Sequence, residues 1–214
     1  MPIPGLTALR ALRRGGFLLH KRVMITGATG IVGSIAIELA AASGAWVTAV
    51  ARRDAHSRLR ALGASQAIQS ASETNDRFEL ILESVGGASL TGAIERVAPG
   101  GVIVVFGNTS GESAPFDFRN FRSAQNARET LFHYSAEPPS AFASDLRSLA
   151  ERLANRQISP NEHDWFELPR VITELTSGRF RGKHVFKNTI DVRVHTILSD
   201  RQRRRCGRAS ALPY

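Results

Sequence analysis

Three glycines follow a short β-branched segment in the first part of the chain. Gly27, Gly30 and Gly33 come directly after the apolar residues 23–25, and the helix-forming residues 34–42 follow them. Glycines at this spacing allow, in turn, a tight bend, a close approach of the backbone to a pyrophosphate, and packing of a helix on a strand. The helix then presents its N-terminal amides to phosphate. The sequence therefore predicts a dinucleotide-binding turn, and the alternative is an ordinary glycine loop of another α/β protein.

Two arginines at the end of the second apolar strand bear on which dinucleotide is bound. In an NAD site an acidic residue about 20 positions after the glycines binds the ribose 2′-hydroxyl, whereas an arginine there accommodates the 2′-phosphate of NADP. This chain has Arg52 and Arg53 at that place. Asp54 stands just past the strand, where we expect it to cap the next helix. The pattern favours NADP(H) over NAD(H); the alternative is that one or both arginines are merely solvated.

The carboxyl ends of parallel strands meet at one edge of a sheet, where dinucleotides bind. We expect the pyrophosphate over residues 28–32 and the nicotinamide against the loops that follow the fourth and fifth strands. The predicted cofactor-binding residues are Gly27, Ala28, Thr29, Gly30, Ile31, Val32, Gly33, Arg52, Arg53, Val85, Gly107, Asn108 and Thr109.

Strands and helices alternate along the chain between short glycine turns. This alternation predicts an α/β fold with a doubly wound parallel sheet of the Rossmann type. Beyond the glycine turn and the second strand, the expected strands are 66–69, 78–85, 102–106, 130–134 and 183–187, and the expected helices are 55–62, 88–97, 140–155 and 168–177. Pro99, Gly100 and Gly101 are expected to separate a helix from the strand at 102–106. The predicted domains are an NADP-binding domain, residues 1–187, and a basic, disordered tail, residues 188–214.

Composition sets limits on the class of protein. A chain of 214 residues with 43% apolar residues can bury a substantial core. The net charge of +9 is uneven, because residues 188–214 hold six arginines and two aspartates and so carry +4. The rest of the chain is only mildly basic, so we do not expect nucleic acid as a partner; contact of the tail with an acidic polymer is the alternative.

The single cysteine and the apolar runs indicate the compartment. Cys206 alone excludes an internal disulfide and the multi-cysteine clusters of structural zinc sites, which favours a reducing, cytoplasmic setting. No apolar run reaches membrane-spanning length. Residues 1–22 carry five basic side chains and no acid, as a transit peptide does. Leu6, Leu9 and Leu12 instead form a helical apolar stripe, which favours an N-terminal helix lying on the domain.

The ordered set of landmarks resembles the medium-chain dehydrogenase/reductase family, in its zinc-independent quinone oxidoreductase-like branch. This resemblance spans residues 5–187 and implies an NADP(H)-dependent reductase of quinones or α,β-unsaturated carbonyls, in which the cofactor carries the hydride. The matching pieces are Gly5-Leu-Thr-Ala-Leu-Arg-Ala-Leu, Thr26-Gly-Ala-Thr-Gly-Ile-Val-Gly-Ser, Leu62-Gly-Ala, Leu80-Ile-Leu-Glu-Ser-Val-Gly-Gly, Pro99-Gly-Gly, Phe106-Gly-Asn and Gly182-Lys-His-Val-Phe.

The chain departs from this family pattern in two ways. Ile31 stands where the branch usually has a glycine, so its side chain either crowds the pyrophosphate or points toward the helix–sheet interface. The resemblance also implies a barrel-like catalytic domain before the helix that begins near Gly5, and no residues here correspond to it. We therefore expect an enzyme fragment. The resemblance places the strand of His133 and Tyr134 near the nicotinamide and the edge of a homodimer, and the alternative for these two residues is a structural role in that strand.

Other catalytic classes find little support. A short-chain dehydrogenase needs a tyrosine with a lysine four residues later, whereas Pro138 follows Tyr134 at that distance and Tyr214 is the last residue. An atypical, non-catalytic relative of the short-chain dehydrogenases is the alternative. The six histidines are scattered and no metal site is expected. Two classes remain: an NADPH-dependent oxidoreductase, complete or residual, and a non-catalytic nucleotide-binding module.

Overall fold

The computed structural model describes residues 2–115, 117, 129–132, 139–153, 161–177 and 184–187. The chain divides into two compact units, Met1–Ser159 and Pro160–Tyr214. The proposed tail, residues 188–214, lies outside the described residues, as do His133 and Tyr134. The division of the chain into a domain 1–187 and a tail stays a prediction.

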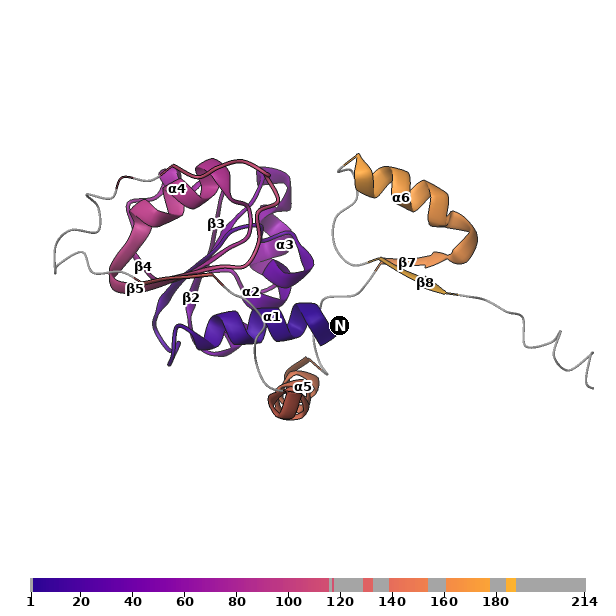
Figure 1. The fold of residues 1–214 in the computed structure, drawn as a ribbon, viewed down its shortest axis with the longest axis horizontal. Helices are drawn as coiled ribbons and strands as arrows, with labels where there is room; N and C mark the ends of the chain where they lie inside the picture. The colour runs from indigo at the N-terminus through magenta and orange to yellow at the C-terminus, as the bar shows by residue number, and fades with distance from the viewer. Residues whose placement is uncertain are drawn as a thin grey trace, which may run out of the picture. The chain divides into compact units, whose positions relative to one another are not determined.

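The first unit is built on a six-stranded parallel sheet with the order β3-β2-β1-β4-β5-β6. This is the doubly wound order, and it confirms the predicted fold class. Helices lie on the sheet and connect its strands (Figure 1). The strands are β1 Arg22–Ile25, β2 Trp46–Val50, β3 Gln66–Ile68, β4 Phe78–Glu83, β5 Val97–Val105 and β6 Glu129–Phe132.

The central strands are apolar on both faces because both faces are covered. Along β1, Val23 and Ile25 belong to one apolar cluster, whereas Met24 between them belongs to another. Along β4, Leu80 and Ile81 divide in the same way. Neighbouring side chains of a strand point to opposite faces, so two separate cores sandwich the sheet. The helices of this unit are α1 Pro2–Arg13, α2 Ile31–Ala42, α3 His56–Ala61, α4 Gly87–Arg96 and α5 Pro139–Leu153.

Helix α1 lies on the domain as its leucine stripe predicts. Leu6 and Leu12 are buried, and Leu9 packs against the same apolar cluster. A buried ion pair joins α1 to α5, since Arg10 Nε lies 2.9 Å from Asp145 Oδ2 and both side chains are almost wholly buried. Arg13 also bonds Asp145. The α1 helix is therefore part of the folded unit.

Two predicted boundaries in this unit are wrong. Strand β5 begins at Val97 and runs through Pro99 and Gly101, where the sequence predicts a break before residue 102. Its pairing with β4 is irregular there, and such a register shift accommodates proline and glycine within a strand. Asp54 is not the N-cap of α3: it lies inside the 3-10 turn η1, Arg53–Ala55, and the N-cap of α3 is Ala55.

The second unit contains a two-stranded parallel sheet, β7 Asn161–Asp164 and β8 His184–Lys187, joined through the 3-10 turn η5 Trp165–Glu167 and the helix α6 Leu168–Thr176. The sequence pattern predicts β8 and α6 but does not predict β7. Strand β7 reads Asn-Glu-His-Asp, which has no apolar residue to give the period of a strand. It forms because β8 supplies a backbone partner.

Candidate nucleotide-binding site

The glycine turn between β1 and α2 has the geometry that the sequence predicts for a close backbone approach. Gly27 has φ +55°, a region that favours glycine. A Cβ atom on Gly33 would lie 2.6 Å from the carbonyl oxygen of Gly27 and 2.8 Å from Ala28 Cα. Both of these atoms are backbone, so no side-chain movement relieves that contact. Gly33 is therefore required for α2 to pack against the turn that precedes it.

Hydrogen bonds hold this turn to its neighbours. The buried Ser34 hydroxyl donates to the carbonyl of Ala28 at 3.2 Å, and the amide of Gly30 donates to Gly27 at 2.9 Å. The Ala28 amide donates to the carbonyl of Val50 in β2 at 3.4 Å. Because β2 is the strand beside β1, this last bond ties the glycine turn to the end of the strand that carries the two arginines.

The N terminus of α2 has no side-chain cap and can therefore bind an anion. Its N-cap is Gly30, which has no side chain to cap the helix, and the first turn holds no acidic residue. Amides at a helix N terminus and the helix dipole together favour a negative group. Ile31 and Val32 are half-buried and pack against the apolar cluster beneath the helix. Of the two alternatives for Ile31, the structure shows the one in which its side chain packs into the interface between α2 and the sheet.

Arg52 and Arg53 are both exposed and stand at the carboxyl end of β2. This is the same edge of the sheet as the glycine turn, since β1 and β2 are parallel neighbours in register. The ring of His56 bonds the carbonyl of Ala51 through Nε2 at 2.9 Å. This bond fixes the backbone on which the two arginines stand, and nothing in the sequence indicates it beyond the spacing of five residues.

The loops after β4 and β5 are joined directly by hydrogen bonds. The amide and the hydroxyl of Thr109 both donate to the carbonyl of Ser84, at 3.1 and 3.0 Å, and the amide of Ser110 donates to Val85 at 2.8 Å. The structure therefore brings together Val85 and Thr109, which the sequence predicts to share a site. Asn108 is exposed, and its side-chain oxygen accepts a bond from Ser110 at 3.1 Å.

A hollow of about 620 Å³ lies where these loops meet α4. Gly86, Leu90, Phe106, Gly107 and Asn108 are among the residues that line it. Its volume is in the range of small-molecule sites, about 300–1,000 Å³. The turn Gly86–Gly87 needs positive φ at both residues, and a Cβ on Gly86 would lie only 1.9 Å from Asn108 Oδ1. The two glycines thus let the β5 loop close over the β4 loop.

Glu83, the last residue of β4, was not among the predicted site residues. Its side chain is completely buried, and its carboxylate accepts hydrogen bonds from Thr26, Val85 and Gly86. A glutamate inside an otherwise apolar strand run is a signal that the sequence does offer. Its partner Thr26, however, is 57 positions away in sequence.

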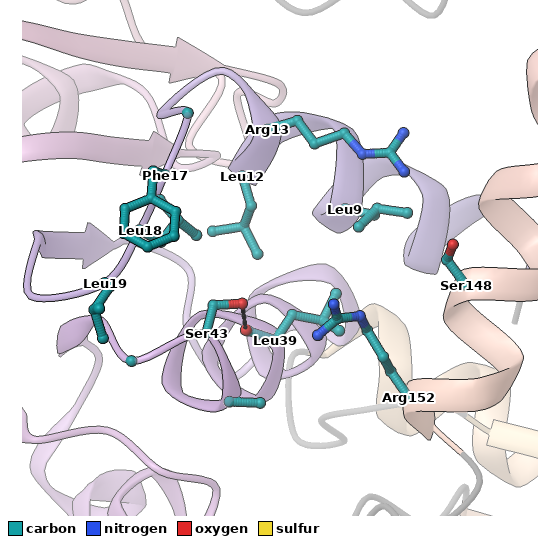
Figure 2. Close-up of a pocket in the computed structure, with 13 residues that line it drawn as sticks. Leu9, Leu12, Arg13, Phe17, Leu18, Leu19, Leu39, Ser43, Ser148 and Arg152 are labelled. Atoms are coloured by element: carbon teal, nitrogen blue, oxygen red, sulfur yellow. Dashed lines mark hydrogen bonds between the residues drawn. The ribbon is translucent and has the colours of Figure 1, made fainter.

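A second hollow, also of about 620 Å³, lies at the opposite end of α2 and is shown in Figure 2. Leucines form much of its wall, Arg13 and Arg152 line it, and Phe17 beside it is 77% exposed. The last carbonyls of α2 face this end and already have partners, including a bond from the Ser43 hydroxyl to Leu39 at 2.8 Å. A helix C terminus repels anions, so we do not assign the cofactor phosphates here.

Two histidines that look isolated in the sequence are partners in the second unit. His163 Nε2 lies 2.8 Å from His184 Nδ1, and the two rings stack. Burial, and then the charge of His163, lower the pKa of His184, while Glu174 acts in the opposite direction. Among the described residues no group of three or more histidine, cysteine or acidic side chains is arranged to hold a metal ion.

Comparison with known families identifies the group to which this unit belongs. Residues 32–151 match the family described as zinc-binding dehydrogenase. The chain belongs to the zinc-binding dehydrogenase family. This result confirms the resemblance to the medium-chain dehydrogenase/reductases that the ordered motifs carry. The match begins at Val32, after most of the glycine turn, and covers both arginines and both loops of the site.

Relatives of this chain match it over part of their length. The mitochondrial NAD(P)H oxidoreductase RTN4IP1 of Bos taurus is 37% identical over 107 residues, which are 44% of this chain and 27% of that protein. The spectinabilin polyketide synthase system protein NorB of Streptomyces orinoci is 29% identical over 198 residues, which are 86% of this chain and 9% of that protein. The chain thus spans about a quarter of RTN4IP1.

Solved structures share the fold. The yhdH oxidoreductase from Salmonella enterica in complex with NADP has a TM-score of 0.73 at 23% identity, and the match covers 87% of this chain and 60% of that one. The quinone oxidoreductase from Coxiella burnetii has a TM-score of 0.67 at 28% identity, covering 88% and 59%. No described helix has the length and apolar character that a membrane crossing requires.

Proposed function

We propose that this chain is the cofactor-binding part of an NADPH-dependent oxidoreductase that reduces quinones or enones. The observation that carries the proposal is the pairing of an open, glycine-lined helix N terminus with two exposed arginines at the end of the adjacent strand. The amides of α2 suit the pyrophosphate, and Arg52 and Arg53 suit the 2′-phosphate. The two arginines are exposed, so packing of the domain does not require them.

The relatives support the same chemistry. RTN4IP1 is named an NAD(P)H oxidoreductase, the yhdH structure contains NADP, and the Coxiella burnetii protein is a quinone oxidoreductase. Reduction of a quinone or an enone is proposed for the whole protein, because the chain spans only about 60% of these structures.

Each part of the site has its own task in this proposal. Bound NADPH supplies the hydride. The glycine turn binds the pyrophosphate over residues 28–32, and the two arginines select the phosphorylated cofactor. Val85, Gly107, Asn108 and Thr109 form the wall against which the nicotinamide rests, because their loops are bonded to each other at the carboxyl edge of the sheet.

We propose in addition that the protein is cytoplasmic and forms a homodimer. The single cysteine supports a reducing compartment. Sedimentation equilibrium of the purified protein tests the dimer, and a monomer at micromolar concentration would contradict it.

Titration calorimetry with NADPH and NADH tests the cofactor assignment. Charge-assisted hydrogen bonds are worth roughly 1.5–3 kcal/mol, so replacing Arg52 and Arg53 with alanine should weaken NADPH binding by about ten- to a hundredfold and leave NADH binding nearly unchanged. The matched control replaces Arg147 and Arg152, two exposed arginines of α5, and removes the same charge. Equal losses for both cofactors, or an equal loss in the control, would overturn the assignment.

A further inference from the structure

Glu83 is a fully buried carboxylate at the end of β4, beside the proposed cofactor site. Burying an ionised group is costly unless hydrogen bonds compensate it. The strand around it is apolar, with Ile81 and Leu82 also fully buried. A glutamate at this place therefore needs a reason that packing does not supply.

Hydrogen bonds from two turns converge on this carboxylate. Oε1 accepts bonds from the Thr26 hydroxyl at 3.1 Å, the Val85 amide at 3.1 Å and the Gly86 amide at 3.2 Å. Oε2 accepts a second bond from the Gly86 amide at 3.1 Å. Every one of these groups donates, which is the pattern that an ionised carboxylate accepts. The Glu83 carboxylate thus fixes the positions of the Val85 and Gly86 amides by hydrogen bonds.

Thr26 extends this contact to the other turn. It directly precedes Gly27, and its hydroxyl oxygen accepts a bond from the amide of Ser84 at 3.1 Å. The Glu83 carboxylate and the Thr26 hydroxyl therefore join the end of β1 to the loop after β4. The glycine turn itself has separate support, because Ser34 and Gly30 bond the backbone of Ala28 and Gly27.

We propose that Glu83 is a positioning residue for the nicotinamide half of the cofactor. By holding the amides of Val85 and Gly86, it fixes the loop that faces the nicotinamide in the proposed function, on which this inference rests. The adenosine half depends on the glycine turn and on Arg52 and Arg53, which Glu83 does not contact. Loss of the Glu83 contacts then weakens the binding of whole NADPH and spares a ligand that has only the adenosine half.

The test uses two ligands and the Glu83→Gln variant. NADPH contains both halves, whereas adenosine 2′,5′-bisphosphate contains the two phosphates of the adenosine half and no nicotinamide. Glutamine keeps the size of glutamate but turns one acceptor into a donor that faces the Gly86 amide. We expect NADPH binding to weaken by about tenfold, the effect of one lost hydrogen bond to a charged group. Binding of adenosine 2′,5′-bisphosphate should stay within about twofold of the wild type.

The control is Glu79→Gln, the same substitution on the same strand. Glu79 lies at the other end of β4, where its carboxylate accepts a bond from the Arg22 amide at 2.8 Å. We expect no change in the affinity for either ligand. If Glu83→Gln does not fold, Thr26→Val removes the hydroxyl contact while keeping the shape of the side chain, and it should produce the same selective loss at about threefold.

The outcomes separate this inference from the proposed function. Failure of the wild type to bind NADPH contradicts the proposed function. If the wild type binds NADPH but both ligands lose affinity equally in Glu83→Gln, or in Thr26→Val where that is the variant that folds, then Glu83 has a general structural role and the inference is wrong. No loss for either ligand also overturns it.

Discussion

The two ends of α2 differ in whether their backbone polar groups are capped by the chain itself. At the N terminus, Gly30 provides no capping side chain and the first turn is free of acidic residues. At the C terminus, the amides of Gly44 and Ala45 donate to Ala41 and Ala40 at 2.9 and 3.1 Å. This arrangement is a Schellman motif, in which the helix satisfies its own carbonyls. One end of the helix is closed by the chain itself, whereas the other offers donors to an anion.

The hollows near these regions show that volume does not identify a site. The hollow between the β4 and β5 loops and the hollow at the C-terminal end of α2 both measure about 620 Å³. Only the first lies at the carboxyl edge of the sheet, next to the glycine turn. Backbone donors and strand direction therefore decide where a dinucleotide binds, and the following substitutions test this difference.

The largest expected effect on binding comes from adding one methyl group at the N-terminal end of α2. In Gly33→Ala the new Cβ meets backbone atoms at 2.6 and 2.8 Å, so the turn must move. We expect NADPH affinity to fall by about tenfold to a hundredfold, since overpacking of this kind costs about 1–3 kcal/mol and displaces the binding amides. Calorimetry with the purified variant measures this loss.

Gly44→Ala is the matched substitution at the other end. Gly44 has φ +80°, so alanine there is strained and should lower the free energy of unfolding by about 1–2 kcal/mol. NADPH affinity should nevertheless equal that of the wild type. If Gly44→Ala weakens binding as much as Gly33→Ala does, the two ends of α2 are not functionally different.

The ion pair between α1 and α5 should affect stability and not binding. Asp145→Asn leaves Arg10, which is 3% exposed, without its carboxylate. Removing one partner of a buried pair should lower the free energy of unfolding at neutral pH by about 3 kcal/mol. Urea unfolding measures this difference, and calorimetry should find NADPH affinity unchanged.

The same ion pair makes the stability depend on pH. Burial by itself raises the pKa of Asp145, but hydrogen bonds from Arg13 and Arg10, together with their charges, hold this pKa below its ordinary value of 3.8. A lowered pKa in the folded state stabilises the protein above the unfolded value and loses that contribution as the pH falls through the folded value. The stability difference between wild type and Asp145→Asn should therefore shrink below about pH 4. A difference that stays constant down to pH 2 would contradict this assignment.

The smallest expected effect is that of Ser34→Ala at the open end of α2. The buried hydroxyl makes one bond, to the carbonyl of Ala28, and its loss should cost about 1 kcal/mol. Because this bond holds the phosphate-facing turn, NADPH affinity should fall by about threefold to fivefold. Ser43→Ala removes the equivalent side-chain bond at the closed end, from Ser43 to Leu39, and should leave affinity unchanged.

The sequence by itself determined the parts of this protein that rest on local spacing. Gly27, Gly30 and Gly33 predict the turn because each glycine is required by a steric constraint that arises within a few residues of it. The alternation of strands and glycine turns predicts the doubly wound sheet, which the strand order confirms. The two arginines follow from their distance to the glycines, and their role in binding stays a prediction.

Only the tertiary structure decided the contacts between distant segments. Thr26 meets Glu83, and Arg10 meets Asp145, because the sheet and the helix packing bring together residues that are 57 and 135 positions apart. Strand β7 is polar and forms through backbone pairing with β8. The alternation of apolar and polar side chains that predicts a strand is absent from β7. Strand β5 continues through Pro99 because β4 pairs with it on both sides of an irregularity. Long-range hydrogen bonds outweigh local preferences at these positions, and local patterns do not show them.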